Sequence, residues 1–270
     1  LENPKSESLT LDLRAQASYG LIFSRLGIGD FNGAVQAADL FLAGFPEDEK
    51  AIEVYFWKGE ALLMLARWAE ARKSFGKVST KHELGALAIL GRAYTYYEAG
   101  LWKQAIPVFT EATKMLHGNP RLSAEAIARE ADARYNTKDY IGAGNLYQKV
   151  LNDFPLDSAA ESAALRLGGL RFHQAEYNEA EAAFSDFLRR WPKSSRSQEA
   201  QYWRGLAQIR GGRFALARVS LLRLVRDHPK SPLAASAWLQ IGHAYYNEGR
   251  FVESGTTYSR VLSGNPSSKE

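Results

Sequence analysis

The residue types that most often carry out catalysis are present in this sequence, but their spacing does not bring them together. The histidines are dispersed along the 270 residues, at His82, His117, His173, His228 and His243. None forms a His-x-x-x-His pair, which would place two metal ligands on one helix face. Motifs for a serine nucleophile, a phosphate-binding loop and a dinucleotide site are also absent from the sequence. We therefore predict no catalytic residues, no metal site and no cofactor.

Carboxylates and thiols are the remaining candidates for acid, base or nucleophile chemistry. Carboxylates such as Glu176, Glu179 and Glu181 fall at solvent-facing positions of a predicted helix. The sequence contains no cysteine, which excludes disulfides, zinc–thiolate sites and cysteine nucleophiles. Both observations favour a protein that is not an enzyme.

Positive charge is concentrated in one stretch of a chain whose net charge is only +4. Between residues 189 and 230, eleven Lys or Arg residues accompany two acids. Such an excess attracts an acidic protein surface, and the alternative is a solvated outer face. The positive residues fall on several predicted helix faces and match no nucleic-acid motif, so we expect no nucleic-acid binding. The candidate basic patch consists of Arg189, Arg190, Lys193, Arg210 and Arg213.

The composition is that of a folded protein, with 46% apolar and 24% charged residues. No run of residues approaches the roughly 18 consecutive apolar residues that a membrane span needs. We expect membrane association only through a lipid anchor outside this sequence.

One pattern recurs seven times and indicates the elements that position these residues. An aromatic residue is followed three positions later by a small residue, and the small residues lie 37, 34, 38, 37, 37 and 37 positions apart. A constant period in this range is typical of a solenoid. The small residues are Ala34, Ala71, Ala105, Ala143, Ala180, Ala217 and Ser254.

Each copy is predicted to form two helices. In the last copy, Trp238, Ile241 and Tyr245 have helical spacing, Gly249 interrupts the stripe, and a second stripe begins at Phe251. Small residues in both helices would allow the two backbones to approach closely. In the first helices these are Gly59, Gly168, Gly205 and Gly242, and a proline follows most second helices, at Pro46, Pro155, Pro192, Pro229 and Pro266.

This arrangement resembles the tetratricopeptide repeat (TPR) family over nearly the whole chain. The resemblance implies an all-α fold, a right-handed superhelical solenoid of about seven helix pairs. The first copy departs from the family pattern, with Ile22 where glycine is typical and Ala38 where an aromatic residue is typical. We predict one solenoid over residues 9–266, between a flexible segment (1–8) and a tail (267–270), with repeats at 15–48, 52–85, 86–120, 124–157, 161–194, 198–231 and 235–266.

The resemblance also implies a binding surface, because the first helices of TPR proteins line a concave groove. The inward register positions are mostly aromatic or apolar here, and such residues are favoured anchors for a partner. The alternative for each residue is that it packs against the neighbouring first helix as core. The lysine and asparagine clamp of TPR co-chaperones is missing from these positions. The predicted groove residues are Phe56, Tyr94, Tyr97, Tyr135, Phe172, Tyr202, His243 and Tyr246.

The junctions at 154–158, 191–195 and 228–231 combine an aromatic residue or histidine with proline and serine. They resemble those of bacterial envelope TPR proteins, the outer-membrane-assembly lipoproteins (BamD type) and the Tol–Pal-associated periplasmic proteins (YbgF type). This implies a non-enzymatic scaffold, periplasmic or outer-membrane-associated, that binds a protein or peptide partner. Two alternatives stay open: a cytoplasmic regulatory TPR adaptor, and the helical domain of a larger envelope enzyme such as a lytic transglycosylase.

The end of the sequence gives one more expectation. Residues 266–268 repeat the junction that opens a new copy at 192–194 and 229–231. A terminal repeat exposes an apolar face unless it is covered. We therefore expect the chain to continue into a longer protein or its last repeat to be covered by a partner, and an oligomer is compatible with this.

Overall fold

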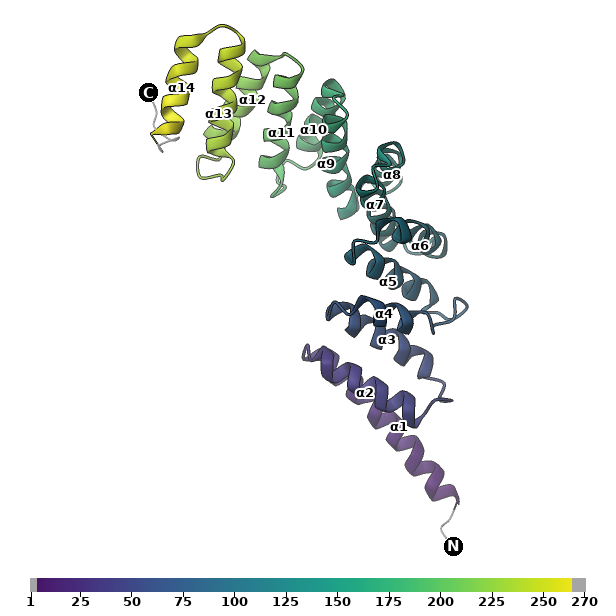
Figure 1. The fold of residues 1–270 in the computed structure, drawn as a ribbon. Helices are drawn as coiled ribbons and strands as arrows, with labels where there is room; N and C mark the ends of the chain where they lie inside the picture. The colour runs from purple at the N-terminus through teal and green to yellow at the C-terminus, as the bar shows by residue number, and fades with distance from the viewer. Residues whose placement is uncertain (1–3, 264–270) are drawn as a thin grey trace. The chain divides into compact units, whose positions relative to one another are not determined.

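The computed structural model describes residues 4–263, with side chains from residue 12 onward. Within that range it contains fourteen α-helices and no strand, which confirms the all-α fold and the seven helix pairs (Figure 1). The chain divides into two compact units, Leu1–Ala143 and Gly144–Glu270. The single solenoid over 9–266 stays a prediction, and the tail at 267–270 lies outside the described residues.

The helices follow one another with short turns in each unit. The first unit contains α1 (Pro4–Gly27), α2 (Phe31–Gly44), α3 (Ala51–Met64), α4 (Trp68–Phe75), α5 (Gly85–Glu98), α6 (Trp102–Met115) and α7 (Pro120–Asn136). Helix α8 (Tyr140–Asp153) contains the boundary between the units. The second unit contains α9 (Ser158–His173), α10 (Tyr177–Arg190), α11 (Ser197–Arg210), α12 (Phe214–Asp227), α13 (Ala234–Asn247) and α14 (Phe251–Leu262).

The N-terminal boundary differs from the expectation of a flexible segment over residues 1–8. Helix α1 begins at Pro4, so residues 4–8 are helical. Proline is well suited to the first position of a helix, where its missing N–H has no partner to lose. No glycine or further proline follows before Gly20, so nothing in the sequence interrupts the helix.

The recurrent aromatic residue opens every second helix. It is the first residue of each even-numbered helix from α2 to α14, namely Phe31, Trp68, Trp102, Tyr140, Tyr177, Phe214 and Phe251. The small residue three positions later is at most 2% exposed in every copy. The sequence pattern therefore marks both the start of the second helix and the side of it that packs against the first.

The glycines of the first helices lie against a bulky side chain of the second helix, sixteen residues later. A Cβ atom added to Gly59 would lie 2.6 Å from the ring of Phe75, closer than real Cβ contacts allow. Equivalent approaches of 2.5–2.7 Å occur between Gly168 and Phe184, Gly205 and Leu221, and Gly242 and Tyr258. Close packing between the two helices therefore requires glycine here, even though glycine weakens a helix by about 0.5–1 kcal/mol relative to alanine.

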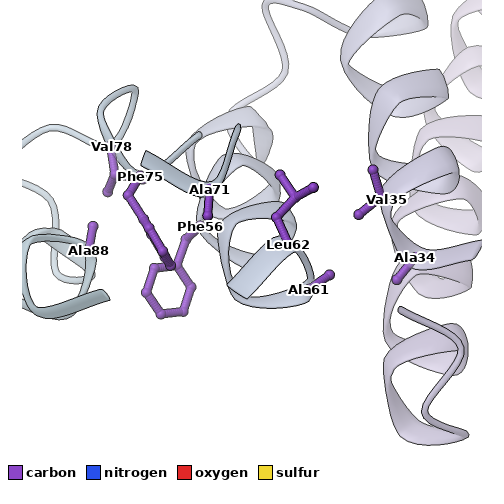
Figure 2. Close-up of a cluster of buried hydrophobic side chains, with 9 residues drawn as sticks. All are labelled: Ala34, Val35, Phe56, Ala61, Leu62, Ala71, Phe75, Val78 and Ala88. Atoms are coloured by element: carbon purple, nitrogen blue, oxygen red, sulfur yellow. The ribbon is translucent and has the colours of Figure 1, made fainter. Parts of the chain in front are cut away.

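The contact at Phe75 extends to the next repeat. A Cβ atom on Gly91 of α5 would lie 2.6 Å from the same ring, so Phe75 is wedged between glycines of two successive first helices. Figure 2 shows the buried apolar side chains around Phe75, with Phe56 beside it. The ring centroids of Phe75 and Phe56 are 5.9 Å apart. Each repeat thus shares its core with its neighbour, as expected for stacked helix pairs.

The turn inside each repeat uses a left-handed residue two positions before the aromatic one. Four copies have glycine there, with φ between 70° and 76°. The other three copies have Ala66, Lys138 and Ala175, with φ of 57°, 67° and 60°. A side chain with a Cβ atom is strained in this conformation by roughly 1–2 kcal/mol, whereas glycine is not.

We expect Ala175→Gly to raise the free energy of unfolding of the second unit by up to about 1 kcal/mol. The relief of left-handed strain exceeds the extra entropy that glycine brings to the unfolded chain. Urea denaturation followed by circular dichroism measures the change. The matched control is Ala182→Gly in the middle of α10, which should destabilise instead. A loss of stability in both variants would contradict the assigned turn conformation.

Candidate functional site

The predicted groove residues divide between the two units, and one of them is core. Phe56 is only 5% exposed and packs against the ring of Phe75, so its placement in the groove is corrected. The reason is that Gly59 and Gly91 have no side chains and leave room for the ring of Phe75. Phe56 packs in the space beside that ring. The other seven keep some solvent exposure: Tyr94, Tyr97, Tyr135, Phe172, Tyr202, His243 and Tyr246.

Four of these rings pack edge-on against the aromatic residue that opens the second helix of the same repeat. The pairs lie five residues apart in sequence, because the first ring ends one helix and the second begins the next. Their centroids are 4.9–5.5 Å apart, in the range of favourable aromatic pairs. The pairs are Tyr97–Trp102, Tyr135–Tyr140, Phe172–Tyr177 and Tyr246–Phe251. Part of each of these four rings is therefore covered by a contact within the repeat, and only the uncovered part can contact a partner.

In the first unit, two tyrosines of α5 bond to acids of α7. The hydroxyl of Tyr94 donates to Glu125 at 2.5 Å, and that of Tyr97 donates to Asp132 at 3.2 Å. Arg129 lies over the ring of Tyr97 at 5.6 Å and 3.5 Å from Asp132. Burial raises the pKa of Tyr94 well above its usual range, and the carboxylate of Glu125 raises it further. The hydroxyl stays protonated at neutral pH, so these bonds hold two neighbouring first helices together.

In the second unit, the most exposed of the predicted groove residues lies on α13. Tyr246 is 59% exposed and Leu239, seven residues earlier, is 39% exposed. Between them, His243 is half-buried, with its ring 5.7 Å from that of Tyr258. Residues at this spacing lie on one face of a helix. The face combines an exposed aromatic ring, an exposed aliphatic side chain and an imidazole.

The predicted basic patch is not one surface. Arg189, Arg190 and Lys193 precede α11, whereas Arg210 is the last residue of that helix and Arg213 follows it. The fourteen residues of α11 span about 20 Å. Three of these arginines are also engaged: Arg189 and Arg190 pair with Asp186, and Arg213 lies 2.6 Å from Glu181. Helix α11 separates the two groups, so the single patch is corrected to two separate clusters.

One surface feature was not predicted from the sequence. Helix α12 exposes three apolar side chains at i, i+3 and i+6, Leu216, Val219 and Leu222, which are 51%, 66% and 37% exposed. The equivalent positions of α10 and α14, 37 residues away, hold Glu, Ala, Thr or Ser. A comparison of the copies position by position would have revealed it, because only this second helix is apolar there.

The described residues offer little for other kinds of site. Among them, no group of three or more histidines and acids could hold a metal ion. None of the helices in residues 4–263 is both long enough and apolar enough to cross a bilayer.

Comparison with known proteins identifies the repeat. A family model for the tetratricopeptide repeat matches residues 165–232 and 210–269. No curated protein is similar enough in sequence to match the chain.

Solved structures with the same fold share little sequence with this chain. The C-terminal part of a TPR protein from Cytophaga hutchinsonii is 14% identical, with a TM-score of 0.73 over 94% of this chain and 96% of that one. A TPR protein from Parabacteroides merdae is 16% identical, with a TM-score of 0.62 over 92% of both chains. MamA from Desulfovibrio magneticus is 17% identical, with a TM-score of 0.56 over 68% of this chain and 97% of that one. The tetratricopeptide repeat model thus matches residues 165–269, and the solved structures show the same fold over more than nine-tenths of the chain.

Proposed function

We propose that the chain is a non-enzymatic scaffold that binds a protein or peptide through the exposed face of its first helices. The observation that carries the proposal is the accessible stripe of α13, where Leu239, His243 and Tyr246 share one face. Aromatic side chains bury much area at low entropic cost and are common anchors at interfaces. TPR proteins are generally scaffolds of this kind, which supports the proposal.

A photo-crosslinking experiment tests this surface directly. A benzophenone amino acid replaces Tyr246 in one variant and Gln104, an exposed residue of α6, in the control. We expect a crosslinked partner from the native host only with the probe at position 246. Equal labelling at both positions would contradict a specific binding face.

We expect Tyr246→Ala to weaken binding of that partner by about tenfold or more, the usual effect of removing an aromatic anchor. The fold should be nearly unaffected, because the ring is 59% exposed and packs edge-on against Phe251, which is itself 63% exposed. Affinity by calorimetry and thermal stability by circular dichroism separate the two effects. A large loss of stability without a selective loss of binding would show that the ring is core.

For the location of this scaffold we propose the bacterial envelope, in assembly or maintenance of the periplasm or outer membrane. The support is the sequence of the junctions around Pro155, Pro192 and Pro229, which resembles that of envelope TPR proteins. Fractionation of the native host, with detection of the endogenous protein, tests the proposal. Recovery in the cytoplasmic fraction would favour the regulatory adaptor instead.

A further inference from the structure

Residues of α10, α11 and α12, three helices of the second unit that Figure 1 labels, line a cavity of about 430 Å³. The charged residues that line it are three arginines, Arg189, Arg204 and Arg223, and one acid, Asp227. Asp227 is already engaged with Arg226 at 2.8 Å and with Arg223 at 3.5 Å. Arg189 pairs with Asp186, which lies outside the lining, so the positive charge left without a carboxylate partner is that of Arg204.

Arg204 is the residue at which this charge is least compensated. Its side chain is half-buried, and its Nε atom is buried without a hydrogen-bond partner. Burial lowers the pKa of Arg204, and the nearby positive charge of Arg223 lowers it further. Glu181 acts in the opposite direction, but it pairs with Arg213 and accepts a hydrogen bond from Gln208.

Other repeats show how a charge at this position is normally compensated. The residue just before the small residue of the first helix is Lys58 in α3, and it pairs with Asp39. In α5 the small residue is Ala93, and the residue before it is Arg92, whose guanidinium lies 3.6 Å from the carboxylate of Glu111. In α3 and α5, a basic side chain at this position thus pairs with a carboxylate from a flanking second helix.

The repeat that contains Arg204 lacks both of these carboxylates. In register, Ser185 of α10 stands where Asp39 stands in α2, and Arg223 of α12 stands where Glu111 stands in α6. Both residues line the cavity beside Arg204. The site has the geometry of an internal ion pair from which the acid is missing, and a half-buried charge without a partner is unfavourable.

The preceding repeat provides a neutral counterpart of the same cavity. A cavity of about 380 Å³ lies at the equivalent place between α8, α9 and α10, within Gln148–Arg190 of the second unit. Its lining has Leu167 in place of Arg204 and Asp186 in place of Arg223. Two arginines and two acids line it, so its charges balance. The cavity therefore recurs in two successive repeats, and of these two only the cavity around Arg204 has more arginines than acids in its lining.

We propose that the cavity around Arg204 binds a carboxylate side chain of an acidic segment in a partner protein. That carboxylate would take the place that Asp39 and Glu111 occupy in the earlier repeats. The exposed apolar stripe of α12 ends at Leu222, next to Arg223, and gives such a segment a surface to lie on. The inference rests on the proposed scaffold role only for the source of the carboxylate, and it concerns a different surface from Tyr246.

Titration with a hexaglutamate peptide tests the site, followed by the arginine Nε–Hε signals in nuclear magnetic resonance. We expect the Arg204 signal to shift on addition of the peptide. Arg204→Leu, which copies Leu167, should weaken peptide binding about tenfold or more. The control Arg210→Gln removes the same charge from the exposed end of α11 and should change the affinity less than about twofold.

A second variant keeps the test decisive if Arg204→Leu folds poorly. Arg223→Glu copies Glu111, so it should pair with Arg204, preserve or raise the melting temperature and abolish peptide binding. An equal loss of peptide affinity in Arg204→Leu and Arg210→Gln would overturn the site. So would an Arg204 Nε–Hε signal that does not shift when the peptide is added. A stronger response to inorganic phosphate than to the peptide would overturn the carboxylate assignment. None of these results depends on crosslinking at position 246, so the two proposals can fail separately.

Discussion

Replacing Phe75 with alanine should lower the free energy of unfolding of the first unit by about 3–5 kcal/mol, the range for a fully buried phenylalanine. The ring is 2% exposed and fills the space between Gly59 and Gly91, which belong to two successive first helices. Neither glycine has a side chain that could move into the cavity. The loss in the free energy of unfolding should therefore lie near the upper end of that range.

Urea denaturation gives the size of this effect, and amide hydrogen exchange over α3, α4 and α5 gives its location. Phe251→Ala is the matched control, because this aromatic residue is 63% exposed. Its replacement should lower the free energy of unfolding by less than about 1 kcal/mol. Because stability in repeat proteins is largely a sum over neighbouring repeats, exchange should accelerate around α4 more than in α13. Equal effects of the two substitutions would show that Phe75 is not the wedge between the repeats.

The first repeat offers a second large effect, in which two destabilising changes should offset each other. Ile22 and Ala38 occupy the register positions that hold glycine and phenylalanine, Gly59 and Phe75, in the next copy. Both are buried in one cluster, at 1% and 0% exposure, so the large and small members have exchanged places. Ile22→Ala alone should destabilise by about 2–5 kcal/mol through a cavity, and Ala38→Phe alone by about 1–3 kcal/mol through overpacking.

The double variant recreates a combination that the chain already uses, Ala93 with Phe109, both 0% exposed. We expect the two changes to couple favourably by about 0.5–3 kcal/mol in a double-mutant cycle measured by denaturation. The control pairs Ile22→Ala with Ala37→Phe, a buried alanine one position out of register. Additive effects in the test cycle, or equal coupling in both cycles, would refute exchange of large and small residues at this contact.

The repeat itself could be read from the sequence, because its constraint is local and recurs in every copy. Ala71 and Ala180 are small because the second helix touches the first at that point, and Trp68 and Tyr177 begin that helix in each case. A steric requirement that repeats every 34–38 residues leaves the same residue types at the same spacing. The helix pairs and their register followed from that spacing, and the resemblance to the tetratricopeptide repeat family implied the fold class.

Accessibility and charge pairing depended on the tertiary structure, because they arise where two neighbouring repeats meet. Phe56 and Tyr246 were equivalent candidates in the sequence, yet one is 5% and the other 59% exposed. Arg92 and Arg204 occupy the same register position, and only the side chains opposite them, Glu111 and Arg223, distinguish a closed ion pair from an open one. Burial and electrostatic interaction depend on the distance and identity of non-local partners, which a repeat pattern does not encode.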